Sequence, residues 1–85
     1  MYAITVTDYI PGQDTKTETI YEENERDARR TFVDLNLSRF RDTSILGDQF
    51  LRICKETDPL VLVERLYVFF RTIRPESYTV ESKAL

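Results

Sequence analysis

The chain contains no histidine, no tryptophan and a single cysteine, Cys54. Without histidine, the Ser-His and Cys-His pairs that activate a nucleophile are excluded, as is imidazole ligation of a metal ion. A lone cysteine excludes an intramolecular disulfide and points to a reducing, cytoplasmic location. Glycine-rich phosphate loops and spaced acidic calcium loops are also missing. We therefore expect no enzyme, and no bound metal or other cofactor.

Long apolar segments are absent too. The longest apolar-rich run, residues 60–70, is interrupted by Glu64 and Arg65. It is too short to cross a hydrocarbon layer about 30 Å thick. The first residues lack the basic and apolar regions of a secretory signal peptide. We expect neither a membrane-spanning segment nor a membrane partner.

Glycine and proline are scarce, with 2 and 3 residues, while 41% of the 85 residues are hydrophobic and 32% are charged. These proportions are typical of a globular protein and argue against a disordered chain. A chain this short is expected to form one domain over residues 1–85. Its core is small, so association with a partner or with a second copy would add stability.

Charge is distributed unevenly along the sequence. The net charge is -3, yet residues 24–41 carry five arginines against three acids, while residues 1–23 are acidic. Nine of the 12 basic residues are arginine. Arginine favours forked pairing with carboxylates or phosphates. The middle of the chain is therefore where we expect charged contacts with a partner.

Residues 2–22 have the pattern of an antiparallel β-hairpin. Tyr2, Ile4 and Val6 alternate with small or polar residues, and a second alternating segment covers residues 16–22. Turn-forming residues at 10–14 separate the two segments. This hairpin is the first element of the predicted fold.

A helix is predicted over residues 24–37. Asn24 is suited to cap its N-terminus, and Asp27 lies in the first turn, where the helix dipole favours anions. Ala28, Phe32 and Leu35 share one face, which we expect to pack against the hairpin.

The second half of the chain is less clear. Residues 43–57 fit a helical face, which we favour, or two short strands joined at Gly47 and Asp48. Asp58 and Pro59 resemble the start of a helix over residues 59–74. Residues 77–82 are either a third strand or a loose tail. The predicted fold class is α+β, with the N-terminal hairpin packed against two or three helices.

The opposite face of the helix over 24–37 carries the candidate site. Arginines there surround two aliphatic residues, and further arginines follow the helix; the full set is Arg26, Arg29, Arg30, Val33, Leu37, Arg39 and Arg41. If only the inner face is buried, this mixture of arginine and aliphatic side chains suits a protein interface. Alternatively, a third layer of the domain covers the two aliphatic residues and leaves the arginines as a solvated rim.

Two other uses of the surface stay open. Phe40 lies between Arg39 and Arg41, an aromatic and basic pattern that a small nucleic-acid-associated regulatory protein would use. The helix over 59–74 has surplus apolar positions at Val61, Tyr67 and Val68. This helix is therefore either a central core element or part of a homodimer interface.

Residues Thr19 to Phe32, with the sequence TIYEENERDARRTF, resemble a hairpin-to-helix element of small bacteriophage-encoded proteins. These include inhibitors of host RNA polymerase and anti-CRISPR proteins, and a comparable element occurs in certain ribosomal proteins. The resemblance covers about a quarter of the chain and transfers no functional residue. It implies a non-enzymatic protein that binds and blocks a larger complex in the host cytoplasm.

Overall fold

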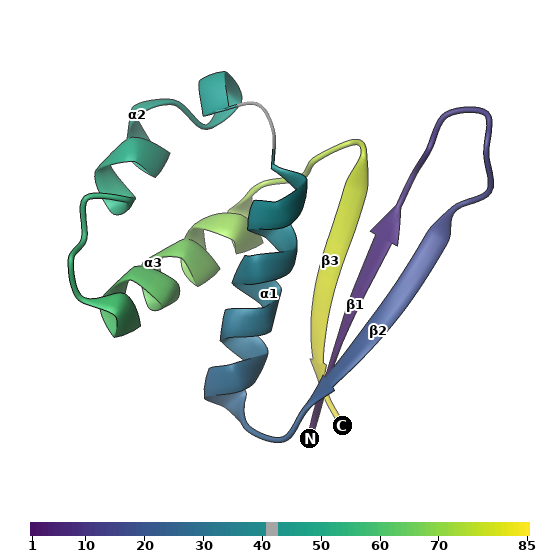
Figure 1. Cartoon of the computed structure of the whole chain (residues 1–85), viewed down its shortest axis with the longest axis horizontal. Helices are drawn as coiled ribbons and strands as arrows, with labels where there is room; N and C mark the ends of the chain where they lie inside the picture. Colours follow the sequence, from purple (N-terminus) through teal and green to yellow (C-terminus); the bar gives the residue numbers. More distant parts are fainter. Residues whose placement is uncertain (41–42) are drawn as a thin grey trace.

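The computed structural model describes residues 1–40 and 43–85, with side chains described for residues 1–40 and 47–85. Its elements follow in the order β1 (Tyr2–Asp8), β2 (Lys16–Glu22), α1 (Glu25–Arg39), α2 (Thr43–Ile53), α3 (Pro59–Thr72) and β3 (Tyr78–Ala84). The strands form one antiparallel sheet in the order β2-β1-β3 (Figure 1). The predicted α+β class is confirmed, with its N-terminal hairpin and a strand at residues 78–84 in place of a loose tail.

The sheet has one covered face and one open face. Strand side chains alternate between the two faces, so Ile4 and Val6 point toward the helices and are buried. Thr5 and Thr7 point the other way, and their hydroxyls lie 3.1 Å and 3.4 Å from those of Thr19 and Thr17 on β2. The helices therefore share one side of the sheet, and a threonine-rich face is left on the other.

The start of α1 is fixed by its cap. The Asp27 backbone N–H donates to Asn24 Oδ1 at 2.8 Å, and the Asn24 side chain donates in turn to the Asp27 carboxylate. Capping of this kind stabilises a helix by about 1 kcal/mol. α1 begins at the predicted place and lies against all three strands.

α3 forms a further layer over α1. Its backbone approaches that of α1 and α2, but no strand backbone within the described part of the chain. Asp58 caps its N-terminus by accepting from the Leu60 N–H at 3.0 Å, and Pro59 occupies the first turn, as the sequence predicts. The core between the layers contains Ile4, Ala28, Phe32, Val33, Leu66, Phe69 and Phe70.

α2 settles the ambiguous segment as helix rather than hairpin. It is interrupted at Gly47, whose φ of 58° and ψ of -153° lie in a region that is nearly exclusive to glycine. Phe50 of α2 packs against Phe40, Phe69 and Phe70, at ring-centroid distances of 6.0, 6.0 and 6.3 Å. Burial of this aromatic side chain favours the helix, while Gly47 accounts for the turn signal in the sequence.

Candidate protein-binding surface

The three arginines near the start of α1 do not share one environment. Arg26 and Arg30 are exposed, and neither pairs with an acid among the described residues. Arg29 is half-buried and pairs with both Glu25 and Glu64. Its guanidinium also lies 5.0 Å from the centroid of the Tyr67 ring. Arg29 therefore links α1 to α3, which leaves Arg26 and Arg30 as the cations that face solvent.

The two aliphatic candidates on α1 also differ. Val33 is only 2% exposed and belongs to the core beneath α3, so the interpretation in which a third layer covers this face is correct for Val33. Leu37 is 39% exposed. Val33 is therefore unavailable to a partner, since α3 occupies that face.

Arg39 is used within the domain. Its Nε and Nη2 donate to the two carboxylate oxygens of Asp8 at 2.8 Å and 3.0 Å, a forked pair that joins α1 to β1. The hydrogen bonds from Arg39 hold the pKa of Asp8 below its usual value of 3.8, although partial burial acts in the opposite direction. Arg41, the last candidate, lies outside the described residues.

Phe40 is half-buried and packs against the edge of the core. Its ring lies 6.0 Å from Phe50 and 6.4 Å from Phe70, centroid to centroid. A base would need an accessible ring on which to stack. The ring of Phe40, the aromatic residue of the pattern that favoured nucleic acid, is thus used in packing against α2 and α3.

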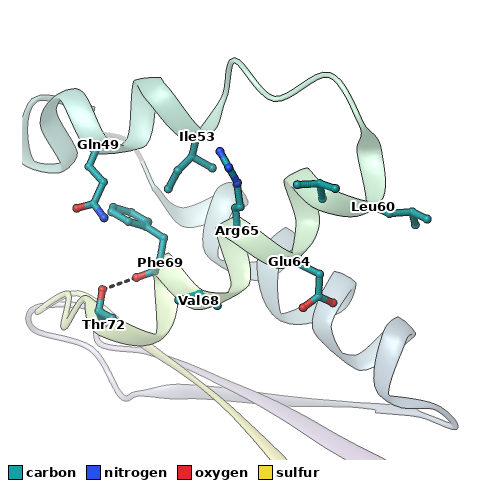
Figure 2. Close-up of a pocket in the computed structure, with 9 residues that line it drawn as sticks. Gln49, Ile53, Leu60, Glu64, Arg65, Val68, Phe69 and Thr72 are labelled. Atoms are coloured by element: carbon teal, nitrogen blue, oxygen red, sulfur yellow. Dashed lines mark hydrogen bonds between the residues drawn. The ribbon is translucent and has the colours of Figure 1, made fainter.

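Three aliphatic side chains of α3 also reach the surface. Leu60 is 52% exposed, Val61 39% and Val68 61%. With Ile53 of α2, they line a groove of about 640 Å³ between α2 and α3. Figure 2 shows Ile53 and Gln49 extending from α2 toward α3, with Arg65 rising between the two helices. We call this the α2–α3 groove.

The groove continues into a cleft that contains the unpaired arginines. Leu60 and Glu64 line the α2–α3 groove and also line a second cleft of about 420 Å³, together with Arg26 and Arg30. The two hollows are therefore contiguous at the N-terminal end of α3. The surface combines aliphatic side chains of α3 with two of the arginines named from the sequence, whereas the sequence analysis expected the aliphatic residues of the site on α1.

Sequence reasoning identified Val61 and Val68 as surplus apolar positions but missed Leu60. Leu60, Glu64 and Val68 are spaced four residues apart, so they form a stripe on one side of α3. That stripe is distinct from the buried one, which includes Leu66 and Phe70. A second stripe with apolar residues, on a helix that already has an apolar core face, is the sequence signal that would have identified Leu60 as a site residue. Tyr67, the third surplus position, is half-buried and packs edge-on against Phe32 at 5.1 Å.

No family model, curated protein or solved structure matches this chain. Within residues 1–40 and 43–85, no helix is both long and apolar enough to cross a membrane. The described acids and Cys54 form no group of three or more that could hold a metal ion. Function is therefore inferred from the surface itself.

Proposed function

We propose that this chain is a protein-binding module whose interface is the α2–α3 groove together with Arg26 and Arg30. One observation carries the proposal: exposed aliphatic side chains lie next to two arginines that have no ion pair within the described chain. Protein interfaces combine an apolar centre with a polar rim and are enriched in arginine. An isolated domain gains nothing from leaving Val68 61% exposed, whereas burial of such a side chain against a partner is favourable.

The chemistry of the surface indicates the kind of partner. A groove between two helices accepts the apolar face of an amphipathic helix. Arg26 and Arg30 at one end of the groove favour carboxylates at the corresponding end of that helix. We therefore propose a protein partner that inserts an apolar helix face with acidic flanking residues, and whose association weakens as salt screens the arginines.

A narrower form of this proposal is that binding blocks a larger host complex, as a phage-type inhibitor of the anti-CRISPR or host-takeover kind would do. The resemblance of residues 19–32 to such proteins supports this form, and the groove provides a surface on which a complex would be held. The inhibition predicted is stoichiometric and requires no turnover.

The test is capture by the tagged protein from host lysate, with and without nuclease treatment, read by mass spectrometry. We expect Val68→Asp and Arg30→Glu each to weaken capture of one complex at least about tenfold. Leu51→Asp is the matched control, because Leu51 of α2 is 55% exposed and does not line the groove. Urea denaturation of each variant shows that it is folded.

Three results would contradict the proposal. Capture that Val68→Asp leaves unchanged would place the interface elsewhere. Capture that disappears with nuclease would favour the alternative, a nucleic-acid-associated regulatory protein that uses the arginines on phosphates. Sedimentation that shows a dimer lost in Val68→Asp, with no other protein captured, would assign the groove to a second copy of this chain.

A further inference from the structure

β3 is an edge strand with unpaired backbone groups along its outer side. The Tyr9 N–H donates to Ser77 O and the Leu85 N–H donates to Met1 O, each at 2.9 Å. Hydrogen-bonded pairs alternate along an antiparallel ladder, so the odd-numbered residues of β3 are the ones that bond to β1. Val80 and Ser82 therefore direct their N–H and C=O groups away from β1, toward the open edge.

A groove of about 490 Å³ follows this edge. It is lined by β3, by the C-terminal half of α3 with the connection to β3, and by Phe32 and Asn36 of α1. The lining from α3, the connection and β3 includes Tyr67, Phe70, Arg71, Arg74, Val80 and Ser82. α3 packs over α1 rather than over a strand, and a short connection, residues 73–77, leads from its end to β3 (Figure 1). The groove thus lies where a fourth strand would continue the sheet. It shares no residue with the α2–α3 groove.

The charged residues that line this groove are mainly cationic. Arg71, Arg74 and Lys83 line it against one acid, Glu81, and none of the three cations forms an ion pair within the described residues. The Arg71 guanidinium lies 5.5 Å from the centroid of the Tyr67 ring. Arg74 Nη1 donates to the carbonyl oxygens of Arg71 and Ile73 at 2.7 Å and 2.9 Å, which holds it at the end of α3.

The other edge of the sheet lacks this arrangement. β2 is exposed along most of its length and carries Glu18 and Glu22 against one cation, Lys16, so its net charge is negative. Unpaired strand edges are templates for pairing with another chain. Beside the edge of β3 lies a groove in which cations would recognise an added segment.

We propose that the β3 edge binds an extended acidic segment of a partner protein as a fourth strand. The backbone of the segment would pair with Val80 and Ser82, and its alternate side chains would place carboxylates toward Arg71 and Arg74. A second copy of this chain fits less well, because its own β3 edge would bring the same cations into the groove.

The probe is a fluorescein-labelled peptide as long as β3, in which valine and glutamate alternate. Binding is measured by fluorescence anisotropy, with a peptide of alternating valine and lysine as the control. We expect the acidic peptide alone to bind, with an affinity that falls as salt rises. Amide exchange measured by NMR is the diagnostic readout. The Val80 and Ser82 N–H groups should become protected on binding, while those of Thr79 and Glu81 stay protected throughout.

Two variants test the two parts of the site separately. Ser82→Pro removes an outward N–H without removing a bond to β1, a substitution that edge strands tolerate, and it should abolish the protection at Val80. Thr19→Pro is its matched control, because Thr19 occupies the equivalent outward position on β2. The double variant Arg71→Glu with Arg74→Glu leaves the backbone of β3 intact and should weaken binding about tenfold.

The proposal is overturned if the acidic peptide does not bind, if the lysine peptide binds equally well, or if Ser82→Pro binds like the wild type. It is also overturned if the Val80 and Ser82 amides are already protected in the free protein in a concentration-dependent way. That result would assign the edge to a second copy of this chain.

Discussion

Two grooves flank α3, and they are lined by different kinds of protein groups. The α2–α3 groove is bounded by side chains, chiefly aliphatic ones from α3 and α2. The groove beside β3 combines arginines with the unpaired backbone of an edge strand. A groove of side chains selects shape and apolar area, whereas a backbone edge accepts any extended chain and obtains its selectivity from the charges around it. The same helix thus separates two surfaces suited to different kinds of ligand.

The two grooves also depend on different supports. α2 forms one wall of the α2–α3 groove and is held by the contacts of Phe50 with the phenylalanines of α3. β3 forms one wall of the other groove, and a hydrogen bond from Tyr78 to Asn36 joins it to α1. Both grooves require α3 to stay packed over α1. A substitution between α1 and α3 should therefore affect both grooves. A substitution at the support of one groove should affect that groove alone.

The largest effect is expected for Val33→Asp, which should disrupt both grooves. Val33 is 2% exposed beneath α3, and an uncompensated buried charge costs about 3–5 kcal/mol. Val68→Asp, on the exposed side of α3, should change the free energy of unfolding by no more than about 0.5 kcal/mol. Urea denaturation measures both values. A stable Val33→Asp variant would show that α3 does not cover this face of α1.

Phe50→Ala should affect the α2–α3 groove alone. Phe50 is half-buried, so we expect a loss of about 2 kcal/mol, below the range for a fully buried phenylalanine. Looser packing of α2 should weaken partner capture while the Val80 and Ser82 amides remain protected by the acidic peptide. Partner capture and amide protection are measured in parallel on the same variant. Loss of the protection would mean that the two grooves are coupled through α3.

Tyr78→Phe examines the support of the groove beside β3. The Tyr78 hydroxyl donates to Asn36 Oδ1 at 2.9 Å, and Asn36 Nδ2 donates to Phe32 O at 2.9 Å. Because Asn36 is buried, loss of the hydroxyl leaves its oxygen without a donor and should cost about 1–2 kcal/mol. Tyr9→Phe is the control, since Tyr9 is 44% exposed.

The same residue predicts an alkaline limit of stability. Burial raises the pKa of Tyr78, and the nearby Arg39 only partly opposes this effect. A group whose pKa is higher in the folded state favours folding below its unfolded pKa and loses that contribution as pH rises. Wild-type stability should therefore fall above pH about 10, and Tyr78→Phe should lack that component. Identical pH profiles would exclude a role for this hydroxyl.

Local signals in the sequence predicted most of the fold. The caps at Asn24 and Asp58 and the alternation in residues 2–22 depend on neighbours within a few positions, and the structure has the corresponding elements. Gly47 was ambiguous for a physical reason. A glycine with positive φ occurs both in turns and at helix breaks, so only the contacts of Phe50 with distant residues distinguish the two.

The candidate site was less predictable because it depends on which layer covers which face. A helical wheel places Val33 beside the arginines but cannot show that α3 lies over it. Arg39 and Asp8 are 31 residues apart, so their pairing follows from the packing of α1 on β1. The groove beside β3 depends on the strand order β2-β1-β3, which leaves Val80 and Ser82 at an edge. Neither periodicity nor charge along the chain contains that information.

The smallest effect is expected for Asp8→Asn, which should leave both grooves intact. Its side chain is 32% exposed, so the pair with Arg39 is worth about 1 kcal/mol or less at neutral pH. Hydrogen bonds from Arg39 lower the pKa of Asp8 below 3.8 in the folded protein, so its contribution is present above that pH and disappears as the pH falls further. Urea denaturation of wild type and variant should give a difference that is constant from neutral pH to about pH 5 and shrinks toward pH 3. A difference that grows in acid would reverse the sign of this linkage. Loss of ligand binding at either groove would instead show that the half-buried pair between Asp8 and Arg39 is needed to hold α1 in place on β1.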